Sequence, residues 1–271
     1  MPAQTRPEQP LADRLKTLAK HPQFTWWIGH VLVLVCSIRY FLSLLTLSLS
    51  PPTSSSLSYR LAFIGAITTY GVVLYKTYVN KIQTLDINFI GRLLRDDNAL
   101  YFGVAVYWLL TSRVSVALVP FATYSVFHFS TYLRNNVIPA VSPSLSKSPL
   151  STKITAFVDA NFPHAMRFVA VFELVAITIR LALPLVLFRV RAIFTLLLWV
   201  MFLRFREASS TQMRDAVVRS GQWVDHLCLQ PGTPDVIRRV VWPRVKAFAA
   251  GLQIPRAPAA AQANASPRKT Q

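Results

Sequence analysis

The histidines are the residues of this chain best suited to metal binding or acid–base catalysis, yet their spacing favours neither. They are scattered along the sequence, at His21, His30, His128, His164 and His226. No two lie four residues apart, and the chain has no Cys-x-x-Cys pair, no Walker motif and no dinucleotide-binding glycine pattern. Helical metal sites and nucleotide sites depend on such spacings. We therefore expect no catalytic residue, no metal and no cofactor. One alternative stays open, in which His128 acts with Asp159 or His164 as the acid–base pair of a lipid-modifying enzyme.

Glu173 is a second candidate for chemistry, because it is the one acidic residue in the long apolar stretch 168–203. Arg180 follows seven residues later, two helical turns on, and so lies near the same helix face. Ionisable groups at membrane depth often line an ion or substrate path, which would make the protein a small transporter or channel. One acid among several arginines does not form a proton relay, so we favour a structural role in which Glu173 pairs with an arginine and locks helices together. The candidate partners are Arg39, Arg113 and Arg180.

The composition is that of a membrane protein rather than a soluble one. Hydrophobic residues make up 53% of the 271 residues and charged residues only 15%, against about 25% charged in an ordinary globular protein. Lys and Arg number 29 and Asp and Glu 11, which gives a net charge of +18. Such a chain suits an anionic lipid bilayer, and we expect neither nucleic acid nor a small-molecule substrate as partner. Two cysteines are too few for a disulfide-stapled secreted domain.

Four apolar stretches, 27–49, 61–79, 100–129 and 168–203, are candidates for membrane insertion. The first is about 34 Å long as a helix, enough to cross a bilayer core of about 30 Å. The third is interrupted at Thr111–Arg113, and the fourth contains Pro184, Arg189 and Arg191 and is too long for one crossing. Both are expected to fold back on themselves. The predicted fold is an all-α integral membrane protein of helical hairpins (27–79, 100–129 and 168–203), with about six membrane segments, some short or re-entrant.

The distribution of basic residues predicts the orientation of these hairpins. Four polar segments, one before the apolar stretches and the others between and after them, carry 23 of the 29 Lys and Arg residues. Cytosolic loops of membrane proteins are enriched in Lys and Arg, so both termini are expected to be cytosolic. The predicted domains are a cytosolic N-terminal segment (1–26), a membrane domain (27–203), a cytosolic amphipathic helical tail (204–254) and a disordered end rich in Ala and Pro (255–271).

The tail contains an amphipathic basic helix that starts at Thr233-Pro234-Asp235, a favourable helix beginning. Its apolar residues recur every three or four positions, at Ile237, Val241, Val245, Phe248 and Leu252. The basic residues on its other faces are Arg238, Arg239, Arg244 and Lys246. Pro243 is expected to kink or divide the helix near Val241. We predict membrane binding by these residues, but packing on the cytosolic ends of the hairpins would produce the same periodicity, so both readings stay open.

Several short motifs, in this order, resemble those of the transmembrane protein 33 family, which includes the fungal pore-membrane nucleoporins. The motifs are Asp96-Asp97-Asn98 before a broken apolar hairpin, the segment 128–134 (HFSTYLR), 168–170 (FVA) with Phe172-Glu173, and 202–206 (FLRFR) with Ser209-Ser210. The similarity extends over residues 24 to 250. No single motif is specific, and the resemblance depends on their order and spacing.

The resemblance implies a multipass protein of the endoplasmic reticulum (ER) membrane and nuclear envelope without enzyme activity. It further implies roles in ER tubule organisation and in nuclear pore assembly or distribution. The expected partners are curved anionic bilayer, reticulon-type membrane shapers, and nuclear pore components or an import receptor. The Ala- and Pro-rich end and the Ser- and Pro-containing insert 141–151 depart from the animal members of the family.

Overall fold

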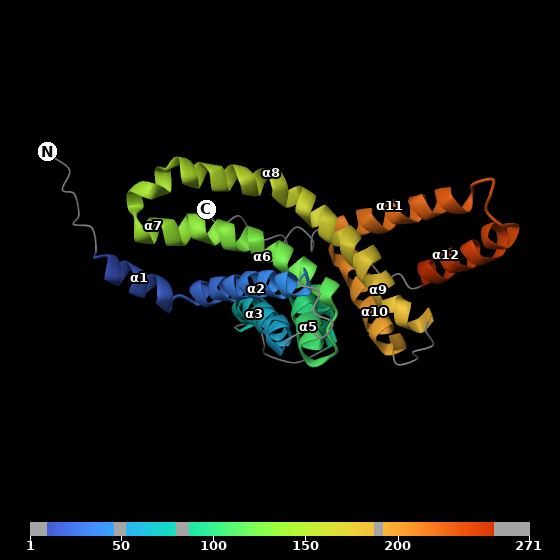
Figure 1. The fold of residues 1–271 in the computed structure, drawn as a ribbon, viewed down its shortest axis with the longest axis horizontal. Helices are drawn as coiled ribbons and strands as arrows, with labels where there is room; N and C mark the ends of the chain where they lie inside the picture. Colours follow the sequence, from blue (N-terminus) through green and yellow to red (C-terminus); the bar gives the residue numbers. More distant parts are fainter. Residues whose placement is uncertain (1–9, 46–52, 80–86, 187–191, 252–271) are drawn as a thin grey trace. The chain divides into compact units, whose positions relative to one another are not determined.

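All regular structure in the described part of the chain is helical. The computed structural model describes residues 10–45, 53–79, 87–186 and 192–251, and none of these lies in a strand (Figure 1). Four helical segments are long and apolar enough to cross a membrane: Pro22–Leu45, Ser55–Tyr78, Ser115–Val141 and Pro149–Leu185. The protein is therefore an all-α integral membrane protein, which confirms the predicted fold class.

The chain divides into two compact units, each assembled from separate stretches of sequence. The first unit comprises residues 1–81 and 105–165, and the second comprises residues 82–104 and 166–271. The divisions fall inside two helices, α5 (Asp97–Leu110) and α8 (Pro149–Phe172). The predicted membrane region 27–203 thus contributes to both units, whereas the described part of the tail belongs to the second.

The first unit is built around a hairpin of two long apolar helices. Its helices are α1 (Leu11–Lys20), α2 (Pro22–Leu45), α3 (Thr53–Tyr78), the 3-10 turn η1 (Ser115–Ala117), α6 (Leu118–Tyr132), the π-helical turn η2 (Leu133–Val137), α7 (Ile138–Val141) and the 3-10 turn η3 (Pro143–Lys147). Helices α2 and α3 pack along each other, and α6 packs on α2. The helix α2 begins at Pro22, five residues before the predicted apolar stretch.

Two glycines bring α2 and α3 into direct backbone contact. A Cβ atom added at Gly65 would lie 2.7 Å from the carbonyl oxygen of Gly29 and 3.0 Å from the amide nitrogen of Val33. A Cβ atom added at Gly29 would lie 2.9 Å from the carbonyl oxygen of Gly65. Small residues permit this close approach between membrane helices, where dispersion contacts are a main source of attraction.

The predicted break near Arg113 is present, and α3 stabilises it. Helix α5 ends at Leu110, and helical structure resumes at Ser115. Between them the Val114 amide donates a hydrogen bond to the hydroxyl of Tyr59 (3.1 Å), and the Arg113 guanidinium donates one to Ser55 Oγ (3.5 Å). These bonds satisfy polar groups that the interruption of the helix leaves without helical partners.

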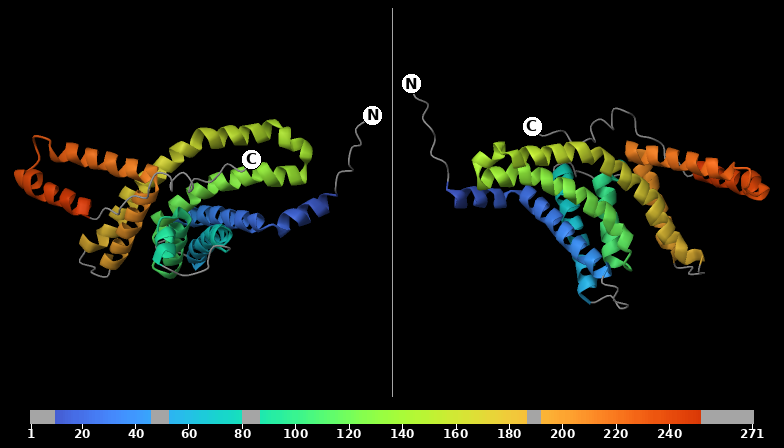
Figure 2. Two further views of the ribbon diagram at one scale, coloured as in Figure 1. Left: turned by 180° about the vertical axis from the view of Figure 1, so that it is seen from behind. Right: turned by 45° about the horizontal axis from the view of Figure 1, so that its top comes forward.

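The second unit contains a helical hairpin followed by the two tail helices. Its elements are α4 (Ile87–Leu93), the π-helical turn η4 (Glu173–Ile177), α9 (Thr178–Val186), α10 (Ala192–Ser209), α11 (Thr211–Cys228), the π-helical turn η5 (Ile237–Val241) and α12 (Trp242–Gly251). Helices α9 and α10 lie side by side (Figure 2). The Trp199 indole joins them by donating a hydrogen bond to Thr178 Oγ1 (3.2 Å). The predicted fold-back of 168–203 is thus present, while Arg189 and Arg191 lie outside the described residues.

Candidate functional site

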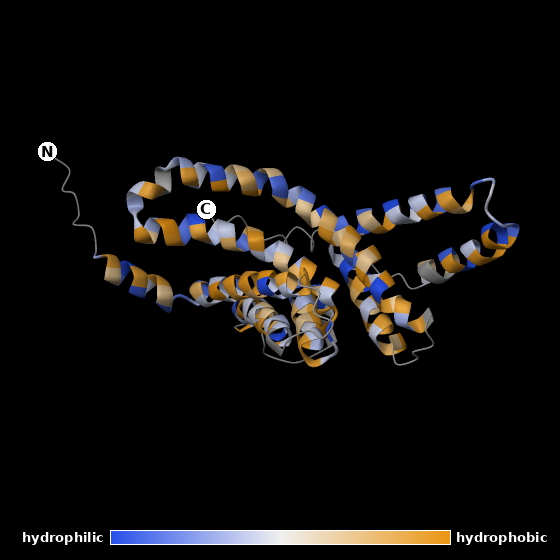
Figure 3. Ribbon diagram, viewed as in Figure 1, coloured by the Kyte–Doolittle hydropathy of each residue, from blue (hydrophilic) through white to orange (hydrophobic). Residues whose placement is uncertain are grey.

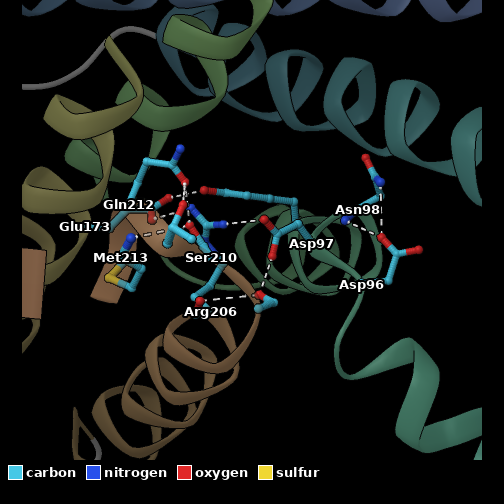
Figure 4. A network of polar contacts seen from close by, with 11 residues as sticks. Asp96, Asp97, Asn98, Glu173, Arg206, Ser210, Gln212 and Met213 are labelled. Carbon is cyan, nitrogen blue, oxygen red and sulfur yellow. Dashed lines mark hydrogen bonds and ion pairs between the residues drawn. The ribbon is translucent and has the colours of Figure 1, made fainter. Parts of the chain in front are cut away.

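A buried network of charged and polar side chains joins three elements of the second unit (Figure 4). Its centre is Arg206 on α10, which is 3% exposed. The Arg206 guanidinium contacts the Asp97 carboxylate at the start of α5 (2.6 Å) and the Glu173 carboxylate in η4 (3.5 Å). Glu173 is fully buried, and its other oxygen accepts a hydrogen bond from the Tyr101 hydroxyl (2.5 Å). The Arg206 guanidinium also lies over the Tyr101 ring, 4.9 Å from its centroid.

The residues that follow Arg206 extend this network to the tail. Ser209 donates a hydrogen bond from its hydroxyl to Asp97 Oδ1 (2.5 Å), so Asp97 is bound from two positions of α10. Ser210 then caps α11, because its hydroxyl accepts a hydrogen bond from the Met213 amide (3.3 Å). Ser and Thr at a helix N-cap satisfy amides that have no partner within the helix. The start of the tail is therefore tied to α5 and α10.

The arrangement is that of a structural clamp. A buried charge is costly unless it is paired and hydrogen-bonded, and here Glu173 has Arg206 on one oxygen and Tyr101 on the other. Asp97, which is partly exposed, supplies the second carboxylate to the guanidinium. A closed set of contacts of this kind holds three helical segments in a fixed register.

The partner of Glu173 differs from the candidates named from the sequence. Arg39 and Arg180 are exposed, and no ion pair joins either of them to a carboxylate of a described residue. Arg113 donates to Ser55 instead. The expectation for Arg180 assumed a regular α-helix, whereas η4 is π-helical. A π-turn takes up one extra residue and so rotates the following helix by about 100°, which removes Arg180 from the face of Glu173.

The contact between Asp97 and Arg206 was also not predicted from the sequence. Asp96 and Asp97 point in different directions, as neighbouring helical residues must. The Asp96 carboxylate accepts hydrogen bonds from the amide and the side chain of Asn98 (2.8 and 3.1 Å), and so caps α5. Asp97 is left to bind Arg206 (Figure 4).

In the tail, α12 is fastened to α11 through a single carboxylate. Asp225 accepts a hydrogen bond from the Trp242 indole (2.6 Å) and an ion pair from the Lys246 ammonium (2.9 Å). The hydrogen bond from Trp242 is the main reason that the pKa of Asp225 is lower than usual, and the hydrogen bond from Lys246 lowers this pKa further. Trp242 and Lys246 are four residues apart and therefore lie on one face of α12.

The apolar stripe of this helix lies on a different face and is exposed. Ile237, Val241 and Val245 have exposed fractions of 40%, 47% and 47%. Val241 precedes Trp242 and Val245 precedes Lys246 by one residue, and neighbouring helical residues point about 100° apart. Apolar and polar residues accordingly alternate along α11 and α12 (Figure 3).

The remaining predicted tail residues have varied surroundings. Arg239 and Arg244 are exposed, and Arg238 and Arg239 form ion pairs with Asp235 one turn earlier. Lys246, predicted to face lipid, is bound to Asp225. The side chain of Phe248 and all of Leu252 lie outside the described residues. The π-helical turn η5 ends directly before Trp242-Pro243, so the hydrogen-bonding pattern changes at the place where Pro243 was expected to disturb it.

His128, the candidate acid–base residue, lies in a packed aromatic cluster of the first unit. The His128 ring lies 4.9 Å from the His30 ring and 5.3 Å from the Trp26 ring, measured between centroids. His30 Nδ1 shares a hydrogen bond with Ser125 Oγ (3.0 Å). No hydrogen bond joins His128 to Asp159 or His164 in the described part of the chain, and the described residues contain no group of three or more potential metal ligands.

Comparison with known proteins assigns the family. The family model for transmembrane protein 33/nucleoporin POM33 matches residues 8–250. Nucleoporin POM33 of Chaetomium thermophilum is 34% identical over 89% of this chain and 88% of its own length. The chain belongs to the transmembrane protein 33/POM33 family. Tetra-spanning protein 1 of Schizosaccharomyces pombe (31% identity, 92% of this chain and 90% of its own) and the pore membrane protein of 33 kDa of Saccharomyces cerevisiae (28%, 86% and 84%) are also similar. No solved structure matches the chain.

In this POM33-family chain, three of the motifs that carry the resemblance meet in the buried network. Asp97 belongs to the first of them, Glu173 to the third, and Arg206 with Ser209 to the last. Residues from three separate motifs of the sequence are therefore in contact in the structure. Arg206 was identified as part of a motif but not as the partner of Glu173, because nothing in a sequence shows which helices become neighbours.

Proposed function

We propose that this protein is a non-enzymatic membrane protein of the ER and nuclear envelope that shapes or stabilises curved membrane. Both termini lie in the cytosol, which agrees with an even number of membrane-crossing helices and with the distribution of basic residues. In this role it contributes to ER tubule organisation and to the assembly or distribution of nuclear pores. The pore and nucleoporin names of its relatives support this location.

The observation that carries the proposal is the exposed apolar stripe of η5 and α12. Ile237, Val241 and Val245 are between 40% and 47% exposed on a helix that is already bound to α11 through Asp225. Basic residues, among them Arg244, lie beside the stripe. An amphipathic helix with this pattern lies in the membrane interface with apolar side chains in the acyl boundary and basic ones on anionic headgroups.

The mechanism is physical. A helix inserted to headgroup depth expands the cytosolic leaflet relative to the lumenal leaflet and so favours positive curvature. The short helix α5, at 14 residues, is less than the length needed for a full crossing and adds volume mainly to one leaflet. The membrane itself is the substrate, and reticulon-type membrane shapers, nuclear pore components or an import receptor are the protein partners that we propose.

The test uses the full-length protein reconstituted into anionic vesicles. The double variant Ile237→Asp with Val241→Asp places two carboxylates in the apolar stripe, where insertion into the acyl boundary would bury them. We expect wild-type vesicles to become smaller or tubular in electron micrographs, and vesicles with the double variant to stay large.

The matched control is Gln222→Asp with Gln230→Asp, which adds the same charge at exposed polar positions of the tail. This control should shape vesicles as the wild type does. Equal vesicle shapes for all three proteins would remove the amphipathic helix from the mechanism. A tagged full-length protein that spreads evenly over flat ER sheets, with no preference for tubules or the nuclear rim, would contradict the proposed role itself.

A further inference from the structure

A hollow at one end of the first unit is lined by polar side chains from three elements. It has a volume of about 310 Å³, within the range of ligand pockets. Arg14 and Thr17 come from α1, His21 and Gln23 from its junction with α2, and Asn136 from η2. None of these side chains is acidic, so the described lining carries net positive charge.

Arg14 is the residue in this lining that requires a ligand of opposite charge. Its Nε and Nη1 atoms are buried and make no hydrogen bond to any described residue. Buried polar atoms are nearly always hydrogen-bonded, and leaving a donor without an acceptor is costly. The planar guanidinium fork matches the oxygen atoms of a phosphate group.

Two neighbouring side chains supply further donors. His21 Nδ1 accepts a hydrogen bond from the backbone amide of Gln23 (3.2 Å), so Nε2 is the ring nitrogen that can donate to a ligand. Asn136 contributes a side-chain amide group from η2. Thr17 is already engaged, because its hydroxyl donates to the Asp13 carbonyl (2.9 Å). The lining thus combines the Arg14 guanidinium with two further hydrogen-bond donors.

The position of the hollow fixes the source of the anion. His21 and Gln23 flank Pro22, the first residue of the candidate membrane-crossing segment Pro22–Leu45, and Asn136 lies in the last turns of the candidate segment Ser115–Val141. Tyr132, which also lines the hollow, stacks on Trp27 with ring centroids 5.6 Å apart. Trp and Tyr concentrate at the level of lipid headgroups. This position, beside the ends of two candidate membrane-crossing segments, favours a lipid phosphate as the anion.

We propose that this hollow binds the phosphate of an anionic glycerophospholipid, with Arg14 as the central contact and His21 and Asn136 as additional donors. A zwitterionic lipid is less suitable because its ammonium group finds no carboxylate in the described lining. The hollow is formed by α1, η2 and the start of α2, which are remote in sequence from the tail helix. Loss of lipid binding at the hollow and loss of membrane shaping by the tail can therefore be measured with separate variants.

The test titrates full-length protein in a non-ionic detergent with dioctanoylphosphatidylglycerol and counts bound lipids by native mass spectrometry. Arg14→Gln should weaken binding about tenfold, because it removes a charge-assisted hydrogen-bonding group. Lys16→Gln is the matched control: it removes the same charge from an exposed position of α1 outside the lining and should change binding less than about twofold. Asn136→Ala should weaken binding several-fold from the other side of the hollow.

Four results would overturn the proposal. Equal binding by the Arg14→Gln and Lys16→Gln proteins would show a general effect of charge, and normal binding by Asn136→Ala together with Arg14→Gln would exclude this hollow. Equal binding of dioctanoylphosphatidylcholine would refute the preference for anionic lipid. Displacement of the lipid by millimolar inorganic phosphate would assign the site to a soluble anion. Asn136→Ala also keeps the test decisive if Arg14→Gln fails to fold.

Discussion

Replacing Gly65 by alanine should destabilise the protein, although alanine is the better helix former. The added Cβ atom would lie 2.7 Å from the carbonyl oxygen of Gly29 and 3.0 Å from the Val33 amide nitrogen. Both obstacles are backbone atoms, which cannot move aside as the end of a flexible side chain can. Helices α2 and α3 would therefore have to separate along their contact.

The size of the effect follows from two opposing contributions. Overpacking a well-packed contact costs about 1–3 kcal/mol. The better helix propensity of alanine offsets about 1 kcal/mol of this cost. Gly65→Ala should thus lower the free energy of unfolding by up to about 2 kcal/mol, equivalent to up to about 8 °C in Tm for a protein of this size.

The assay is thermal unfolding of the full-length protein in detergent, followed by size-exclusion chromatography of the fraction that stays folded. Gly103→Ala is the control, because Gly103 lies in the interior of α5 and a Cβ atom there has nothing within 4 Å. This control should raise the Tm slightly or leave it unchanged. The argument fails if Gly65→Ala is as stable as the wild type or more stable, since the close contact between α2 and α3 would then not limit packing.

Two further predictions concern the second unit. Arg206→Gln should lower the free energy of unfolding by about 3–5 kcal/mol, because it leaves the buried Glu173 carboxylate without its cation. The control Arg180→Gln changes an exposed arginine and should alter the free energy of unfolding by less than about 0.5 kcal/mol in the same thermal assay. Similar effects of the two variants would refute the structural role of the clamp. The pKa of Asp225 is lowered in the folded protein. The ionised Asp225 carboxylate therefore stabilises the contact between α11 and α12 at any pH above the ordinary aspartate pKa of about 3.9. This stabilisation is lost as the pH falls through the lower pKa that Asp225 has in the folded protein. The emission of Trp242, isolated by comparison with Trp242→Phe, should stay constant from about pH 8 to pH 5 and change only below about pH 4; a change near neutral pH would contradict this assignment.

The helices and their hairpins were predictable because length and hydropathy are local properties of the sequence. The interruption at Arg113 and the fold-back of 168–203 were both inferred from charges and prolines within apolar stretches, and both are present. A charge in the middle of a crossing is costly, so the chain is interrupted near it.

The contacts between helices were not predictable, because they depend on register in three dimensions. The π-helical turn η4 alters the face of every residue after Glu173, and no feature of the sequence marks it. The packing of Gly29 against Gly65 joins residues 36 positions apart, which only the hairpin geometry brings together. The same applies to Asp97 and Arg206, which are separated by 109 positions.

The contact through Asp225 changes how the tail can act on a membrane. A helix of the length of residues 235–251, with Pro243 in its interior, would be only marginally stable on its own in water. A free tail would therefore have to fold as it binds, and the loss of conformational entropy would reduce its affinity. Here Trp242 and Lys246 of α12 both contact Asp225 of α11, and Ile237 and Val245 are exposed on another face. In the proposed function, preorganisation of this kind would leave more of the free energy of burying the stripe for deforming the bilayer, because less of it is needed to fold the helix.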